Sequence, residues 1–259
     1  MPFVKSADAQ IHYSLEGHSE KPALILANSL GADLSMWDSQ VPEFSKSFRV
    51  LRCDTRGHGK SSVTPGPYTI EQLAKDVLAL ADSQQFERFH ICGLSMGGQI
   101  GLWLAANAPQ RLHKVALSST AAKIGTPEMW DTRIAAVRKE GMKNIAAAAI
   151  ERWFTAAFRA KDPSVVGKIH QILEATSPEG YAACCAGLRD FDFREKLGNI
   201  RTPTLVISGT HDPATTPADG QFLAKHIPGA RYAELNGAHL SNIEDAGRFT
   251  QAVLNFLDS

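Results

Sequence analysis

A serine between glycines gives the strongest chemical signal in this chain: Ser95, within the sequence GLSMGG at positions 93–98. An apolar segment precedes it, and a helix-forming segment begins near Ile100. The order of strand, Gly-x-Ser-x-Gly and helix predicts a sharp turn, which lifts the serine hydroxyl out of a sheet and beside a helix N-terminus. A serine in that position is a candidate nucleophile for acyl transfer.

A serine hydroxyl needs a base and a carboxylate that orients the base, and both follow in the order Ser, Asp, His. Asp212 comes soon after a buried-strand pattern at 203–209, and His239 lies in the loop after a short strand pattern at 230–235. Reacting groups of open α/β sheets gather at the carboxyl ends of the strands. We therefore expect Ser95, Asp212 and His239 to meet there as a catalytic triad.

Each of these assignments has an alternative. Asp212 is also suited to closing a turn. His211 competes as the base, but it shares a strand exit with Asp212, whereas His239 comes from a separate loop and can approach Ser95 from the side. Cys92 is the alternative nucleophile, and a cysteine inside an apolar strand is usually inert.

Two backbone N–H groups are expected to form the anion hole for a tetrahedral intermediate. One belongs to Met96, the residue after the serine, and the other to Leu30, in the loop that follows a predicted strand at 22–27. Gly31 lets this loop turn toward a substrate. Ser29 adds a polar side chain to the pocket, so it is a candidate for substrate binding.

The elements that must position these groups follow from the apolar pattern. Strands are predicted at 10–15, 22–27, 48–53, 88–94, 113–119, 203–209 and 230–235. From about residue 48 onward they are mostly separated by helix-length patterns, which indicates a largely parallel sheet flanked by helices. We predict an α/β core at 1–120 and 200–259, with an alanine-rich helical cap inserted at 121–199.

Composition excludes several classes of protein. The 259 residues are 44% hydrophobic and 21% charged, with 27 basic and 27 acidic side chains, which argues for a compact enzyme and against nucleic-acid or membrane partners. No signal-peptide pattern or disulfide framework is present, so we expect a cytoplasmic protein. No zinc-ligand spacing occurs, and the glycine-containing loop at 54–62, expected to form a tight turn near the site, lacks phosphate-loop spacing. We predict no metal and no cofactor.

Six sequence segments together resemble the 3-oxoadipate enol-lactonase family of the α/β-hydrolase superfamily. They are NSLG at 28–31, DTRGHG at 54–59, GLSMGG at 93–98, ERWFT at 151–155, GYAACC at 180–185 and LRDFD at 188–192. The resemblance covers nearly the whole chain, and the NSLG loop and the cap segments make it narrower than the superfamily. It implies that Ser95, Asp212 and His239 open a small anionic lactone to 3-oxoadipate through an acyl-enzyme, in the β-ketoadipate pathway of aromatic degradation.

The implied substrate carries a carboxylate on a short arm, which calls for a cation in the cap. Arg133 shares a predicted helix face with Trp130, and a guanidinium suits a planar carboxylate. Arg152 and Arg189 are competing cations, and Arg133 is also suited to a solvated or salt-bridged position. Trp130 and Trp153 are candidate walls of the pocket, although aromatic residues in a cap often serve packing alone.

Three other functions fit the same residues. A carboxylesterase or perhydrolase would keep the triad without preferring an anionic lactone. A carbon–carbon bond hydrolase would use a similar triad and cap, and a ligand receptor on a hydrolase fold would bind without turnover. A homo-oligomer is also compatible with the sequence.

Overall fold

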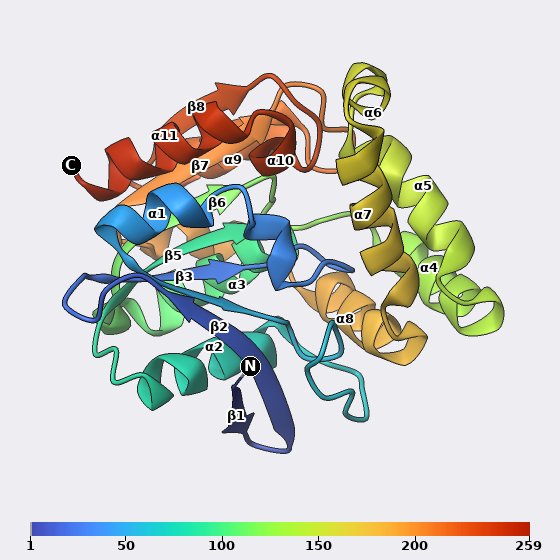
Figure 1. Cartoon of the computed structure of the whole chain (residues 1–259), viewed down its shortest axis with the longest axis horizontal. Helices are drawn as coiled ribbons and strands as arrows, with labels where there is room; N and C mark the ends of the chain where they lie inside the picture. The colour runs from blue at the N-terminus through green and yellow to red at the C-terminus, as the bar shows by residue number, and fades with distance from the viewer. Residues whose placement is uncertain (1) are drawn as a thin grey trace.

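An eight-stranded sheet lies at the centre of the computed structural model, which describes residues 2–259. The strand order is β1-β2-β4-β3-β5-β6-β7-β8 (Figure 1). β1 and β2 pair antiparallel, as do β2 and β4, and every other neighbouring pair is parallel. The strands are β1 Phe3–Ser6, β2 Ala9–Glu16, β3 Ala23–Ala27, β4 Arg49–Cys53, β5 Phe89–Leu94, β6 Leu112–Ser118, β7 Thr204–Gly209 and β8 Arg231–Leu235.

The central strands are apolar because both faces of the sheet are covered. Every residue of β3, β5 and β7 is buried, as expected for parallel strands between two layers of helices. The seven predicted strands are confirmed to within one or two residues at each end. The prediction missed β1, which is a short edge strand with only one buried residue.

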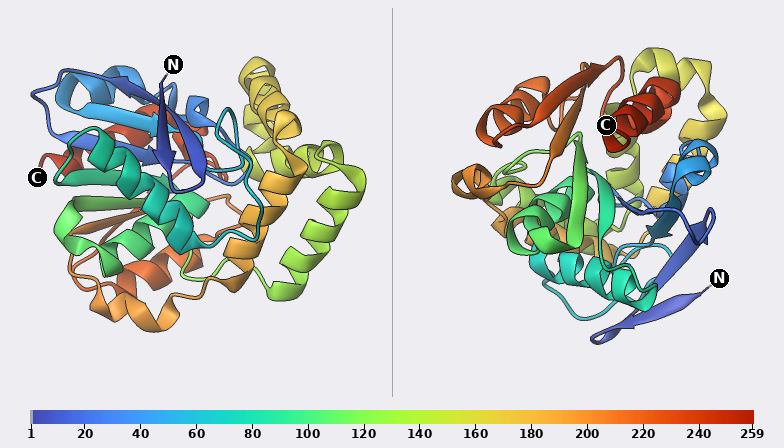
Figure 2. Two further views of the ribbon diagram at one scale, coloured as in Figure 1. Left: turned by 90° about the horizontal axis from the view of Figure 1, so that it is seen from below. Right: turned by 90° about the vertical axis from the view of Figure 1, so that its left-hand side faces the viewer.

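Helices cover the two faces of the sheet in separate layers (Figure 2). One layer contains α1 Val41–Ser47 and α11 Ala246–Leu257, and the other contains α2 Ile70–Ser83, α3 Met96–Asn107 and α9 Pro217–His226. The remaining short helices outside the 121–190 segment are η1 Leu34–Trp37, η2 Pro109–Arg111, η3 Arg194–Asn199 and α10 Ser241–Glu244. The α11 helix packs on the sheet through Phe249, Val253 and Phe256, which recur at helical spacing. These layers bury the sheet and leave its carboxyl edge for the loops.

Five helices between β6 and β7 project beyond one end of the sheet (Figure 1, right). They are α4 Pro127–Glu140, α5 Lys143–Trp153, α6 Ala156–Lys161, α7 Pro163–Ala175 and α8 Pro178–Asp190. Three of them begin with proline after a side-chain cap, which is Thr126 for α4, Asp162 for α7 and Ser177 for α8. Proline is favoured there because the first helical N–H has no partner to lose.

Close backbone contacts join these helices to the rest of the molecule. A side chain at Gly180 would collide with the backbone of Gly57, whose φ of +82° forms the tight turn expected in the 54–62 loop. The N–H of Tyr68 donates to the carbonyl of Ala183 on α8 at 3.1 Å. The helices are therefore held over the carboxyl ends of the strands. Within residues 2–259, no helix is long and apolar enough to cross a bilayer.

Candidate active site

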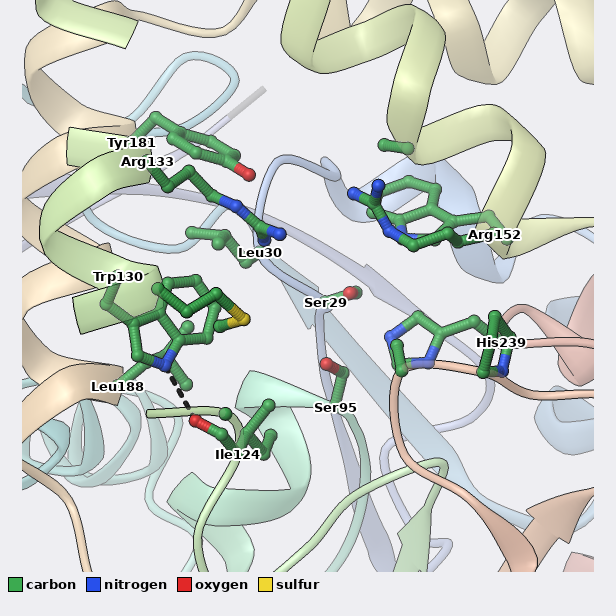
Figure 3. Close-up of a pocket in the computed structure, with 16 residues that line it drawn as sticks. Ser29, Leu30, Ser95, Ile124, Trp130, Arg133, Arg152, Tyr181, Leu188 and His239 are labelled. Atoms are coloured by element: carbon green, nitrogen blue, oxygen red, sulfur yellow. Dashed lines mark hydrogen bonds between the residues drawn. The ribbon is translucent and has the colours of Figure 1, made fainter. Parts of the chain in front are cut away.

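Ser95 lies on a strained turn between β5 and α3. Its φ of 58° and ψ of −113° are unusual for a residue with a side chain. Two interactions hold it there: its N–H donates to the carbonyl of Ser118 at 2.9 Å, and its carbonyl accepts from the Thr120 hydroxyl at 2.8 Å. The turn directs the Ser95 side chain into a pocket below the cap helices (Figure 3).

The glycines on either side of Ser95 are needed because backbones meet at the turn. A Cβ atom at Gly93 would collide with the carbonyl of Gly97, and one at Gly97 would collide with the carbonyl of Ala27 on β3. The Gly-x-Ser-x-Gly spacing therefore reflects the contact between β5, α3 and β3. This is the packing reason for the motif on which the prediction of a nucleophile depends.

The structure brings Asp212 and His239 into direct contact after β7 and β8. The Nδ1 atom of His239 lies 2.8 Å from Oδ2 of Asp212, and both side chains are buried. Asp212 also accepts from the Thr215 hydroxyl at 2.7 Å and from the N–H groups of Ala214 and Thr215 at 2.8 and 3.1 Å. Burial favours a higher pKa for Asp212, but the His239 charge and these hydrogen bonds outweigh it, and its pKa lies below the usual value.

An ionised Asp212 determines which nitrogen of His239 carries the proton in the neutral ring. Nδ1 donates to the carboxylate, so Nε2 is left as the free acceptor. His239 lines the same pocket as Ser95 (Figure 3). This tautomer is the one that can accept a proton from a serine hydroxyl.

The loop after β3 is anchored on both sides of Leu30. The Asn28 amide donates to the carbonyl of Cys53 at 2.7 Å and accepts from the Trp37 indole at 2.9 Å. The N–H of Gly31 donates to Nε2 of the buried His58 at 2.9 Å. These hydrogen bonds fix the backbone of the loop at the edge of the pocket.

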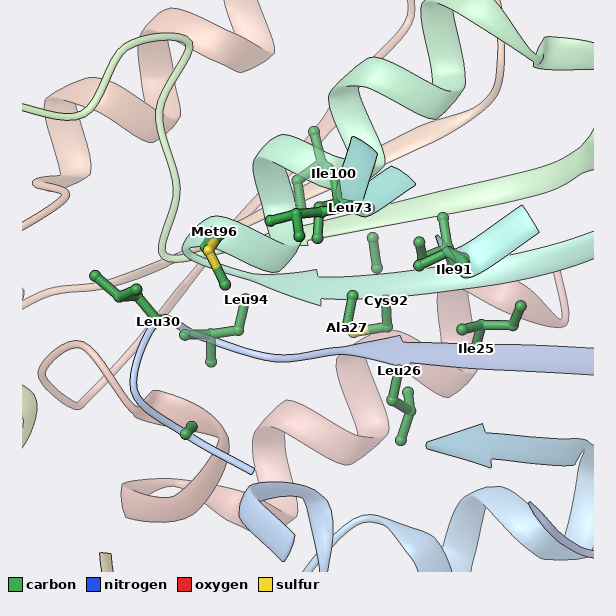
Figure 4. Close-up of a cluster of buried hydrophobic side chains, with 14 of the residues drawn as sticks. Ile25, Leu26, Ala27, Leu30, Leu73, Ile91, Cys92, Leu94, Met96 and Ile100 are labelled. Carbon is green, nitrogen blue, oxygen red and sulfur yellow. The ribbon is translucent and has the colours of Figure 1, made fainter. Parts of the chain in front are cut away.

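The N–H groups of Leu30 and Met96 are the two that the sequence predicts for an anion hole. The two residues lie next to each other where β3 and β5 end (Figure 4). Among the hydrogen bonds of residues 2–259, none uses either N–H as a donor. Leu30 and Ser29 line the pocket, whereas the Met96 side chain is buried in the core, so Met96 would act through its backbone alone.

The pocket has a volume of about 330 Å³ and combines apolar walls with a few polar groups. Ser95 and His239 lie at its base, and the cap helices provide the opposite wall (Figure 3). Its apolar side chains include those of Ile124, Met129, Trp130, Trp153 and Leu188. A cavity of this size and lining fits a small organic molecule.

Two arginines enter the pocket from the cap. Arg133 on α4 lies over the Trp130 ring at 4.9 Å from its centroid and interacts with the Tyr181 hydroxyl. Arg152, near the end of α5, also lines the pocket. Neither guanidinium has a salt bridge within residues 2–259. Both predicted tryptophans, Trp130 and Trp153, are buried side chains in the pocket wall.

Arg189, His211 and Cys92 all lie outside the lining of this pocket. Arg189 instead pairs with Asp131 and Asp190, each at 2.7 Å. His211 is exposed, and its Nε2 lies 3.2 Å from the Asn236 side chain. Cys92 is fully buried in β5, where burial raises the pKa of its thiol far above the usual value. These positions do not favour the three residues for the roles considered from the sequence.

Two residues that contribute to the site were not predicted from the sequence. Thr215 binds the Asp212 carboxylate, and Tyr181 reaches the pocket from α8. Tyr181 lies in one of the segments that carry the family resemblance, but no spacing assigns its contact with Arg133. Among residues 2–259, no group of three or more His, Cys, Asp or Glu side chains is arranged to hold a metal ion.

Comparisons with known proteins agree with this geometry. Residues 22–246 match the family model for the alpha/beta hydrolase fold. The chain is 45% identical to 3-oxoadipate enol-lactonase 2 of Acinetobacter baylyi, over 95% of this chain and 92% of that protein. It is 39% identical to 3-oxoadipate enol-lactonase 1 of the same organism, over 95% and 92% of the two chains.

Solved structures give the same relationship. The crystal structure of the enol-lactonase from Burkholderia xenovorans superposes with a TM-score of 0.98 at 48% identity and covers 100% of both chains. A thermophilic esterase from Thermogutta terrifontis superposes with a TM-score of 0.93 at 29% identity, covering 99% of this chain and 97% of that one. The chain therefore belongs to the α/β-hydrolase family, and within this family it is similar to the 3-oxoadipate enol-lactonases.

Proposed function

We propose that this chain hydrolyses 3-oxoadipate enol-lactone to 3-oxoadipate, a step of the β-ketoadipate pathway. The observation that carries the proposal is one pocket with Ser95 and His239 at its base and an unpaired Arg133 in its cap wall. The first two groups suit attack on a lactone carbonyl, and the third suits the carboxylate of the substrate. The enol-lactonase names of the similar proteins support the same substrate.

Acylation begins when the Ser95 oxygen attacks the lactone carbonyl carbon and Nε2 of His239 takes the serine proton. The carbonyl oxygen becomes an oxyanion, which accepts hydrogen bonds from the N–H groups of Leu30 and Met96. Asp212 stabilises the imidazolium cation that forms and holds its orientation. The intermediate is therefore stabilised at both of its developing charges.

Collapse of the intermediate breaks the bond between the acyl carbon and the ring oxygen. The ring oxygen leaves as an enolate. The imidazolium of His239 then gives up the proton it took from Ser95, so that the enolate becomes the ketone and His239 is neutral again. Because an enolate leaves more readily than a simple alkoxide, His239 matters less as an acid here than as a base in the next step. It then removes a proton from a water molecule that attacks the carbonyl carbon of the Ser95 ester. The proton returns from His239 to the departing Ser95 oxygen, and the acid product ionises to the carboxylate.

The substrate carboxylate arm is assigned to Arg133. Its guanidinium lies over the Trp130 ring and near the Tyr181 hydroxyl, and it is offset from Ser95 across the pocket (Figure 3). Trp130 and Trp153 would enclose the lactone ring, and Ser29 would add a polar contact. In this proposal the reacting carbonyl lies at Ser95 and the charged end of the substrate lies under α4.

We also propose that two parts of the chain have different roles. Residues 1–120 and 200–259 form the catalytic core, and residues 121–199 form a cap that supplies the charged and aromatic wall. We expect the protein to act in the cytoplasm. The reaction consumes water and needs no cofactor. The core would determine the chemistry and the cap the choice of substrate.

The proposal is tested by following the ultraviolet absorbance of 3-oxoadipate enol-lactone with purified protein and with Ser95→Ala. We expect rapid loss of the lactone with the natural chain and a residual rate at least about a thousandfold lower with Ser95→Ala. Ser118→Ala is the matched control, because this buried serine lies beside the elbow but outside the pocket. Cleavage of p-nitrophenyl acetate without lactone turnover would instead favour a carboxylesterase.

A further inference from the structure

The two arginines of the pocket are notable because neither forms a salt bridge within residues 2–259. Arg133 and Arg152 come from different helices and are both half-buried, and the pocket lining contains no Asp or Glu. Acidic groups near the cap are engaged elsewhere, since Asp131 pairs with Arg189 and Glu179 with Arg138. The pocket lining therefore carries two positive charges and no carboxylate. The nearest acidic neighbour of Arg152 in the sequence, Glu151, is exposed and forms no salt bridge with it.

The two charges also affect each other. Burial, and then the nearby Arg133 guanidinium, lower the pKa of Arg152, yet an arginine remains charged at neutral pH. Figure 3 shows the two guanidinium ends entering the pocket above Ser95 from opposite sides. Partly desolvated like charges are costly, and bound anions would relieve that cost.

A ligand with a single carboxylate on Arg133 leaves the charge of Arg152 unmatched. Arg152 lies on the His239 side of the pocket, next to Trp153, whose ring centroid is 6.2 Å from that of His239. Hydrolysis of a lactone creates a new carboxylate at Ser95, beside His239. The product of a lactone that already carries one carboxylate thus has two, and the pocket offers two arginines.

We propose that Arg133 and Arg152 form a two-cation site for a dicarboxylate, in which Arg152 receives the carboxylate formed at Ser95. The site favours the open dianion over a monoanion of the same length, so the product inhibits the protein by occupying the pocket. The two cations in the pocket are independent of the proposed function, whereas the role of Arg152 toward the carboxylate formed at Ser95 and the identity of the natural dicarboxylate rest on it.

The test is a binding measurement that needs no turnover. Adipate and hexanoate have six carbons each and differ in the second carboxylate, so isothermal titration calorimetry with both isolates the effect of that group. Because a charge-assisted hydrogen bond to arginine is among the strong ones, we expect adipate to bind roughly tenfold or more tightly than hexanoate.

Three variants assign the effect to individual arginines. Arg152→Gln should weaken adipate binding about tenfold and leave hexanoate within twofold, whereas Arg133→Gln should weaken both. Arg152→Lys should keep part of the preference, because it retains the charge. Arg138→Gln is the matched control: it lies on the same helix as Arg133, it is exposed and paired with Glu179, and it should change neither affinity.

Equal affinities of the natural chain for adipate and hexanoate would overturn the proposal. An equal loss of affinity for adipate and hexanoate in Arg152→Gln would also overturn it, because that result would mean that one carboxylate contacts both arginines. A protein that prefers adipate but does not open the lactone would refute the proposed function and leave the two-cation site intact. A protein that opens the lactone but binds adipate and hexanoate equally would refute the two-cation site alone.

Discussion

Replacing His58 with phenylalanine is expected to lower turnover and stability together, because His58 holds the loop that carries the Leu30 N–H. The ring is buried, Nε2 accepts from the N–H of Gly31 at 2.9 Å, and Nδ1 lies 3.2 Å from the carbonyl of Arg56. Burial lowers the pKa of His58 to about 4, so the ring is neutral at pH 7. Only the neutral ring can accept from Gly31 at Nε2.

The size of the effect follows from the lost acceptor. Phenylalanine fills a similar space but leaves the buried N–H of Gly31 without a partner, which costs about 1–3 kcal/mol of unfolding free energy. Complete loss of one oxyanion donor lowers turnover about a hundredfold to a thousandfold. A displaced Leu30 N–H keeps part of its interaction, so we expect kcat to fall on the order of tenfold to a hundredfold.

The assay combines urea unfolding at pH 7 with lactone kinetics. His58→Gln is the informative partner, since its amide oxygen can replace Nε2 as the acceptor and should restore most of kcat. His90→Phe is the control, because His90 is also buried with a pKa lowered to about 4 but lies at the other end of β5, against Phe48 and His113. A His58→Phe protein with unchanged kcat, or a His58→Gln protein as slow as His58→Phe, would refute the reasoning.

Three further predictions concern the charges of the site and core. Arg133→Gln should raise KM for the lactone about tenfold with little change in kcat, and an unchanged KM would exclude Arg133 as the carboxylate partner. Asp212→Asn should lower kcat about ten-thousandfold with an unaltered circular dichroism spectrum, because the His239 tautomer is lost. The free energy of unfolding, measured with urea, should fall as pH drops from about 6.5 toward 4, by at most about 1.4 kcal/mol per pH unit for each ring. The reason is that His58 and His90 bind protons over this range in the unfolded chain but stay neutral when buried in the folded one. A stability that is flat over this range would contradict their burial as neutral rings.

Much of the fold was predictable because the central strands are apolar along their whole length. A parallel strand covered on both faces needs no alternation, so β3, β5 and β7 stand out from their helical neighbours. The edge strand β1 has only one buried residue in four, so its sequence lacks the apolar pattern of a strand. It is recognised as a strand only by its pairing with β2. Within the cap, helices α4, α7 and α8 begin at prolines 127, 163 and 178, each after a capping side chain, and these starts were not predicted individually.

The base of the site was more predictable than its cap wall. Ser95, Asp212 and His239 each follow a recognisable strand, and parallel strands place their carboxyl ends at one edge. The choice between Arg133, Arg152 and Arg189 depends on partners that are distant in sequence. Arg189 pairs with Asp131 on another helix, and that contact exists only once α4 and α8 pack. Tyr181 on α8 likewise comes close to Arg133 on α4 only once these two helices pack.

The most direct test of the account is the ratio of kcat/KM for 3-oxoadipate enol-lactone to kcat/KM for p-nitrophenyl acetate, measured on one preparation of the natural chain. The proposed triad beneath Arg133 predicts a ratio far above one, since only the lactone carries a carboxylate for the cap. A ratio near or below one would contradict the central claim, because the pocket would then hydrolyse esters without recognising the anion.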